Sequence, residues 1–185
     1  MRKNFEVKPW FLPMPVLIVA AYDESEHPNA MNAAWGGMCG MDLVQLKISE
    51  GHKTTKNIKK SGAFTVSFGD AAHVAACDYV GLVSGNTVSD KMQTAGFTTV
   101  KSQFVNAPLI EQLPLAFECQ FVTTTETGSL VGKIVNISVD ERILGDDGRP
   151  DFSKFNPIVY NPILRTYHRL GEIVGHAYAD GNKLK

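Results

Sequence analysis

The chain has 185 residues, of which 44% are hydrophobic and 20% are charged, and its formal net charge is −1. This length suffices for one well-buried core but is short for two, so we expect a single domain over residues 1–185. The near-neutral charge balance and the lack of a Lys/Arg stripe argue against nucleic acid or an anionic membrane surface as partners.

Cysteine and histidine usage predicts neither a disulfide framework nor a metal site. The cysteines (Cys39, Cys77 and Cys119) form no CxxC pair, and the five histidines show no metal-binding spacing. Prolines interrupt the apolar stretch near the start, which does not match a signal peptide. Apolar runs stay well below the roughly 18 residues of a membrane-spanning helix. These features predict a cytoplasmic protein with reduced thiols.

The first half of the chain contains short apolar runs separated by turns. We expect strands at residues 16–22, 29–35, 43–49 and 63–68. Between the last two of these strands, residues 51–62 favour a helix. Thr54 or Thr55 can cap its start, and Gly62 ends it.

A second helix is expected at about residues 71–83, with Asp70 as its N-cap. A polar loop at residues 84–96 follows, with room for one helical turn after Asp90. Loops of this length inside a small domain are often functional.

The second half consists mostly of strand patterns. Residues 115–125 and 130–140 flank a short turn and form an expected hairpin. The alternating apolar face of the later strand includes Lys133. This predicts either that Lys133 lies at the rim of the barrel or that the apolar face shifts onto Ile134. Residues 146–157 form a loop rich in Asp, Gly and Pro, and the tail beyond is too irregular to assign. Many strands with few helices predict a mainly β fold, an antiparallel barrel with appended helices.

The segment 49–62, SEGHKTTKNIKKSG, crowds hydroxyl and cationic side chains around the first helix start. A helix N-terminus carries unpaired N–H groups and about half a positive charge, so it suits a phosphate dianion. Ser49, His52, Lys53 and Thr54 are therefore candidate phosphate ligands. Ordinary helix capping with solvated lysines explains the same residues, and this alternative stays open.

Lys91 is a second cationic candidate, in a loop where Gly81 and Gly85 permit unusual backbone turns. Taken alone, Lys91 is better interpreted as a surface charge.

The segment NAMNAAWGG at residues 29–37 has small side chains that would let a flat ring approach the backbone. Trp35 would supply an aromatic edge and Met31 an adaptable apolar contact. Tight packing of a strand under a helix explains this composition equally well. Cys39 lies near enough to be a soft contact, but a small buried residue is the favoured interpretation. No GxGxxG follows a strand, so a Rossmann-type site is not supported.

Together these segments resemble the flavin-reductase-like, FMN-binding split-barrel family, and its flavoredoxin-like branch most of all. The resemblance rests on four ordered stretches: residues 13–16 (PMPV); residues 29–36 (NAMNAAWG); Thr54 and Ile58 followed by Gly62, Phe64 and Val66; and Gly81 with Ser84, Gly85, Asp90 and Lys91. Residues 107–110, 115–119 and 131–134 fit as well, so the match covers nearly the whole chain.

The resemblance implies an FMN-binding split barrel that holds FMN non-covalently and usually forms homodimers with the flavin near the subunit interface. The phosphate would lie at the turn from Ser49 to Thr54, with Lys53 and Lys91 neutralising its charge. Many relatives have arginine where this chain has His52, and a neutral imidazole is a weaker phosphate partner. The isoalloxazine would lie along the strand formed by Asn29, Ala30, Met31, Asn32, Ala33, Ala34 and Trp35.

Three functions remain open on these grounds. The first is an NAD(P)H-dependent flavin reductase, and the second is a flavoredoxin-like carrier that passes electrons between redox partner proteins. The third is a flavin-binding protein without turnover. We nominate no catalytic acid or base, because flavin chemistry resides in the cofactor and does not require one.

Overall fold

The structure is a computed structural model that describes residues 1–185, and strand β2 (Leu17–Tyr22) lies at the centre of its core. The sequence LIVAAY is buried at every position because β2 lies inside a sheet that is covered on both faces. Its odd-numbered residues pack into one apolar cluster with Ile58 and Phe64, and Ile18 and Ala20 pack into the other with Val80.

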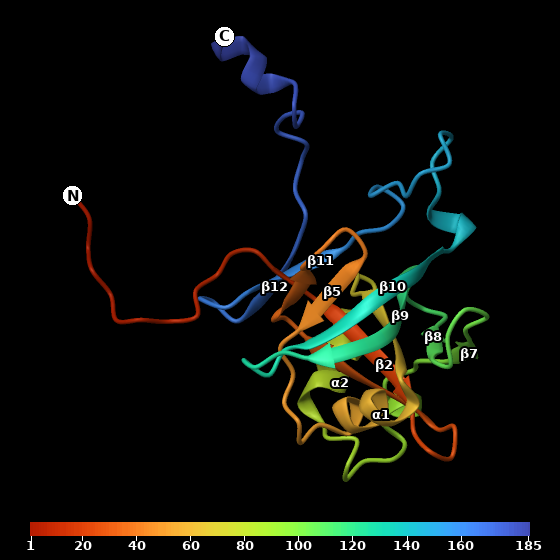
Figure 1. The fold of residues 1–185 in the computed structure, drawn as a ribbon. Coiled ribbons are helices and arrows are strands. Elements are labelled where there is room, and N and C mark those ends of the chain that lie inside the picture. Colours follow the sequence, from red (N-terminus) through yellow and green to blue (C-terminus); the bar gives the residue numbers. More distant parts are fainter.

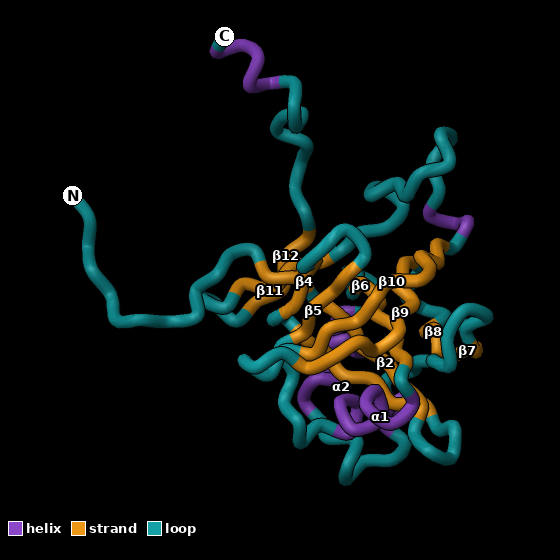
Figure 2. The backbone as a smooth tube through the Cα atoms, viewed as in Figure 1, coloured by secondary structure: helices purple, strands orange, loops and turns teal.

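Seven strands form the main sheet, and every neighbouring pair in it is antiparallel. Figure 2 shows the strands gathered in one curled layer. The predicted mainly β fold is therefore confirmed. In spatial order the strands are β3 (Pro28–Ala33), β2, β6 (Ala63–Phe68), β9 (Leu115–Thr124), β10 (Leu130–Val139), β5 (Leu43–Leu46) and β4 (Gly36–Met38).

Two helices lie together at one end of this sheet (Figure 1). Helix α1 (Lys53–Ser61) buries Ile58 in one cluster, and α2 (Val74–Leu82) buries Cys77 and Val80 in the other. A single further turn, α3 (Lys91–Thr94), follows α2, and short 3-10 helices occur at η1 (Glu141–Ile143) and η2 (Asp180–Leu184). None of the helices has both the length and the apolar composition that crossing a bilayer requires.

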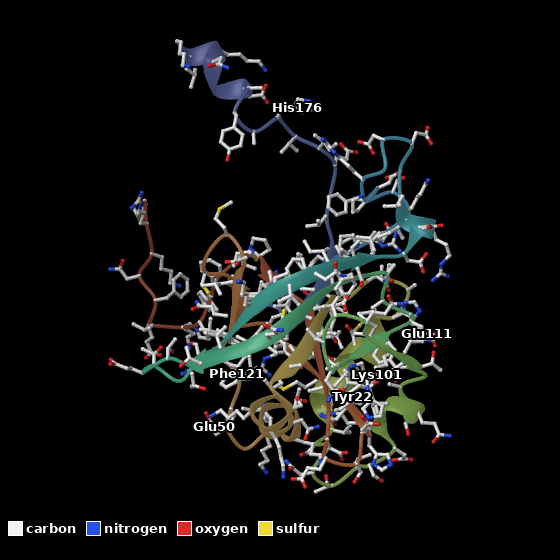
Figure 3. All side chains as sticks on the ribbon, turned by 45° about the vertical axis from the view of Figure 1, so that its right-hand side comes forward. Tyr22, Glu50, Lys101, Glu111, Phe121 and His176 are labelled. Carbon is white, nitrogen blue, oxygen red and sulfur yellow. The ribbon has the colours of Figure 1, made fainter.

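A smaller sheet of β1 (Met14–Pro15), β11 (Ile158–Asn161) and β12 (Thr166–Arg169) continues from the end of β6. The Ile158 N–H donates to the Gly69 carbonyl at 3.0 Å and joins the two sheets. Strands β7 (Thr99–Lys101) and β8 (Pro108–Ile110) form a separate pair. The segments before β1 and after β12 extend away from the sheets, and His176 lies on the second of these arms (Figure 3).

A buried acid, Glu118 on β9, ties three parts of the fold together. Its carboxylate accepts hydrogen bonds from the hydroxyls of Ser102 and Ser138 and from Asn136 Nδ2 at 2.7 Å. Ser102 directly follows β7, and Asn136 and Ser138 belong to β10. This network holds the β7–β8 connection against the main sheet.

The predicted strands at 16–22, 29–35, 43–49 and 63–68 are confirmed as β2, β3, β5 and β6, and the predicted hairpin is confirmed as β9 and β10. β3 and β5 are shorter than predicted because the chain turns into β4 after Ala33 and leaves β5 after Leu46. The Lys47 N–H donates to the Trp35 carbonyl at 2.7 Å and extends the β4–β5 ladder by one pair.

In β10, two alternatives were predicted for Lys133, and the shift of the apolar face onto Ile134 is the one that the structure confirms. Bulges interrupt the β9–β10 register between Val131 and Gly132 and between Ile134 and Asn136. The even-numbered residues of β10 face the core, and the odd-numbered residues from Lys133 to Ile137 face away from it. Lys133 is therefore exposed, and Ile134 packs against the core.

Both predicted helices are present, and Gly62 ends α1 with φ 72° as expected, but the predicted caps are wrong. The N-cap of α1 is His52, so Thr54 and Thr55 belong to its first turn, where they are buried by packing against the sheet. Helix α2 begins only at Val74, since Asp70 caps the preceding turn by accepting from the His73 N–H at 2.9 Å.

Candidate functional site

The start of α1 presents free backbone donors. His52 is extended, and the first helical hydrogen bond runs from the Lys56 N–H to the His52 carbonyl at 3.2 Å. The N–H groups of Lys53, Thr54 and Thr55 therefore have no acceptor in the protein. No side chain caps this end. The helix start is open to an anionic ligand.

Thr54 lies at this helix start with its hydroxyl oriented by a neighbouring strand. Asn29 Nδ2 on β3 donates to Thr54 Oγ1 at 2.6 Å, and both residues are buried. Because the hydroxyl accepts from Asn29, its own hydrogen remains available to a ligand. Gly85 approaches so closely that a Cβ there would overlap the Asn29 amide. This close approach keeps the loop after α2 against β3.

Lys91 is the most unusual residue of the site. Its side chain is 3% exposed, and Nζ donates to the carbonyls of Val80 and Val83 at 3.1 Å each. No carboxylate lies within 4.0 Å of it. Burial lowers the pKa of Lys91 to about 8, since desolvation disfavours the charged form. The surface position predicted for this lysine is wrong, because α3 folds it beneath the end of α2.

These groups surround one hollow of about 230 Å³, formed by β3, the start of α1 and the end of α2. No acidic side chain lines it. Lys53 already forms an ion pair, since its Nζ lies 3.2 Å from the Asp23 carboxylate. Lys91 and the helix start therefore provide the uncompensated positive charge. The lining residues are Asn29, Met31, His52, Lys53, Thr54, 80–85 and Lys91.

β3 is an edge strand of the main sheet, so half of its backbone groups face away from β2. The Asp23 N–H donates to the His27 carbonyl at 3.0 Å, which fixes the alternation of the β2–β3 ladder. In this register the backbone N–H and C=O groups of Met31 and Ala33 form hydrogen bonds with β2. Ala30 and Asn32 then direct their N–H and C=O groups to the free edge.

A second hollow of about 230 Å³ lies farther along β3 and shares Gly81 and Leu82 with the first. Its other lining residues are Asn32, Ala34, Trp35, Asp78, Tyr160 and Tyr167. The two hollows are adjacent along β3, and together they are called the β3 trough. The trough is cationic at the α1 end and aromatic at the Trp35 end.

The structure brings most of the predicted site residues to the trough. Those that line it are Asn29, Met31, Asn32, Ala34, Trp35, His52, Lys53, Thr54 and Lys91. Ala30 and Ala33 bury their side chains in the two apolar clusters. Ala30 can therefore offer only its backbone groups, and Ala33, whose backbone bonds to β2, offers no group to the trough. Ser49 lies outside, and its hydroxyl accepts from the Gly51 N–H at 3.3 Å.

Cys39 does not take part in the trough. It is exposed on the turn after β4, so its interpretation as a buried residue is wrong. Cys77 and Cys119 are buried, and burial raises the pKa of each thiol to about 12. None of the three thiols is therefore an activated nucleophile in the trough.

Asp78, Tyr160 and Tyr167 at the far end of the trough were not predicted as site residues from the sequence. Asp78 lies in the middle of α2, and the tyrosines lie opposite each other on β11 and β12. The only local signal was the recurrence of tyrosines in a tail without clear periodicity.

Comparison with known proteins places this geometry in a family. A family model described as a flavin reductase like domain matches residues 11–170. The flavoredoxin of Desulfovibrio vulgaris (Miyazaki F) has a similar structure, with a TM-score of 0.93 and 33% identity, over 98% of this chain and 100% of that chain. The flavoredoxin from Methanosarcina acetivorans gives a TM-score of 0.90 and 27% identity over 100% of both chains.

An uncharacterized protein of Aeropyrum pernix is 24% identical over 166 residues, which is 83% of this chain. This chain spans 62% of the length of that protein. The split-barrel fold predicted from the sequence is confirmed by the likeness to the flavoredoxins. Since the family model matches most of its residues, the chain belongs to the flavin-reductase-like domain family.

Proposed function

We propose that this chain is a single-domain flavoprotein that binds FMN non-covalently in the β3 trough and uses it for hydride or electron transfer. The observation that carries the proposal is Lys91, a buried ammonium with no acidic partner beside a free helix start. A buried cation without a counter-charge is costly. A phosphate group would supply the missing negative charge.

The residues present fit the two ends of FMN. At the α1 end, the free N–H groups of Lys53, Thr54 and Thr55 together with Lys91 match a phosphate dianion. Along β3, the edge groups of Ala30 and Asn32 match the hydrogen-bonding edge of a flat heterocycle.

When bound, the flavin supplies the redox chemistry and accepts a hydride or single electrons. The protein contributes position and electrostatics. Backbone N–H groups on the β3 edge are preorganised donors, and such donors stabilise negative charge that develops on reduction. His52 is an exposed residue at the phosphate end, where its imidazole can add a hydrogen bond.

A flavoredoxin-like electron carrier is the second candidate, supported by the full-length likeness to two flavoredoxins. The open side of the trough also favours it, since Trp35 is 51% and Leu82 is 75% exposed. A carrier needs an accessible flavin edge, whereas a reductase must also stack a nicotinamide over the ring.

We also propose a homodimer. Met38 at the end of β4 and Met41 just after it leave apolar side chains exposed, and neither lines the trough. Exposed apolar patches of this kind mark interaction sites. Light scattering after size exclusion is expected to give the mass of two chains, and a monomer at micromolar concentration would contradict this proposal.

A spectroscopic titration tests the central proposal. The apoprotein is mixed with FMN, riboflavin or FAD, and binding is followed by the change in flavin fluorescence. FMN is expected to bind much more tightly than riboflavin, which lacks the phosphate, and equal affinities would overturn the proposed site. Anaerobic bleaching by NADH or NADPH then supports a reductase, whereas a yellow protein that ignores both nucleotides supports a carrier.

A further inference from the structure

The aromatic end of the β3 trough contains one acidic side chain, Asp78 on α2. The Tyr167 hydroxyl on β12 donates to Asp78 Oδ1 at 2.6 Å. The Tyr160 ring lies beside the Tyr167 ring, with centroids 5.8 Å apart and an interplanar angle of 48°. Burial and the neighbouring carboxylate raise the pKa of Tyr167, so its hydroxyl stays protonated and keeps donating.

The other carboxylate oxygen of Asp78 has no partner. Tyr167 is the only side chain that donates to Asp78, and no Lys, Arg or His nitrogen lies within 4.0 Å. Asp78 shares a helix face with Gly81 and Leu82, three and four residues on, and all three line the trough. Its charge is therefore half-buried, uncompensated and turned toward the same hollow as Trp35.

This position costs helix stability. Aspartate has a low helix propensity, and Asp78 lies in the middle of α2, where it cannot serve as a cap. Asp78 caps no helix and pairs with no cation. Its single hydrogen bond fixes the carboxylate against β12. These costs are explained if the charge has a role toward the ligand of the trough.

We infer that Asp78 is a redox-tuning residue, held in place by Tyr167, whose negative charge faces the isoalloxazine and lowers the reduction potential of bound FMN. This inference rests on the proposed FMN site. Two-electron reduction places negative charge on the ring, and a fixed carboxylate in a partly desolvated site opposes it. Lys91, which faces the same trough from its other end, would act in the opposite sense but lies at the phosphate end.

The test measures the potential of FMN bound to the full chain, by equilibration with a reference dye. Asp78→Asn keeps an acceptor for Tyr167 but removes the charge. We expect it to tighten the binding of reduced FMN relative to oxidised FMN about tenfold. For a two-electron couple this corresponds to a rise of about 30 mV in the reduction potential. Tyr167→Phe removes the donor that offsets the charge, so the potential is expected to fall.

Glu111→Gln is the matched control, since it removes one negative charge from an exposed residue outside the trough (Figure 3). A potential in Asp78→Asn equal to that of Glu111→Gln, with FMN still bound, would overturn the inference and leave the proposed function standing. If Asp78→Asn does not fold, an unchanged potential in Tyr167→Phe is the overturning result. Failure of the unmodified chain to bind FMN would overturn the proposed function itself.

Discussion

Replacing Lys91 by glutamine separates the charge at the phosphate end from its structural contacts. An ammonium group has three donors, and two of them are used by the Val80 and Val83 carbonyls at 3.1 Å. One donor therefore remains for a ligand. A hydrogen bond to a charged group contributes about 1.5–3 kcal/mol. At about 1.4 kcal/mol per factor of ten, Lys91→Gln is expected to weaken FMN binding about tenfold to a hundredfold.

The assay is a fluorescence titration of the apoprotein with FMN, with riboflavin as the phosphate-free ligand. Lys59→Gln is the matched control, because Lys59 is an exposed cation that pairs with Glu50 at 2.6 Å outside the trough. Lys91→Gln should lose affinity for FMN while riboflavin binding hardly changes. Equal losses for both ligands would show that the lysine acts only by holding α2 and α3 together. An unchanged FMN affinity would show that Lys91 contributes nothing to phosphate binding.

Three further predictions concern Lys91, Gly85 and Glu118. FMN affinity should fall as pH rises above about 8, because the pKa of Lys91 is lowered to about 8 and only its charged form attracts phosphate. FMN titrations of Lys91→Gln at the same pH values should lack this dependence. Gly85→Ala should abolish FMN binding, because its Cβ would displace Asn29, whereas Gly37→Ala, with nothing within 4 Å, should bind normally in the same titration. Glu118→Ala should lower the free energy of unfolding by about 1–3 kcal/mol in urea, because the buried Ser102 and the half-buried Asn136 and Ser138 lose their acceptor. An unchanged midpoint would contradict the structural role of the network.

The parts of the fold that could be predicted are those with a local cause. β2 is a continuous apolar run, and Gly62 ends α1 because it adopts the left-handed conformation with φ 72°. β11 and β12 could not be predicted, because each has only four residues and neither is fully buried along one face. Their pairing depends on contacts with β1, which lies far away in the sequence.

The candidate site also contains parts that could be predicted from the sequence and parts that could not. The helix start at Lys53 and the small residues of β3 belong to continuous segments, so the sequence alone indicated them. The burial of Lys91 depends on how α3 packs against the end of α2, which no local pattern encodes. Asp78 and Tyr167 are 89 positions apart, and only the closure of the small sheet beside α2 brings them together.

The distribution of charge along the β3 trough sets the orientation of a ligand that is anionic at one end and aromatic at the other. Lys91 and the α1 start lie at one end, and Asp78 lies at the other, with β3 between them. A phosphate at the Asp78 end would lie near a carboxylate in an aromatic, partly desolvated hollow. The repulsion between these two negative charges would be screened less than in water. The same ligand reversed would leave Lys91 buried beside an uncharged ring. Both penalties favour the same orientation, so we expect FMN to bind in one orientation, with its ring toward Trp35 and Tyr167.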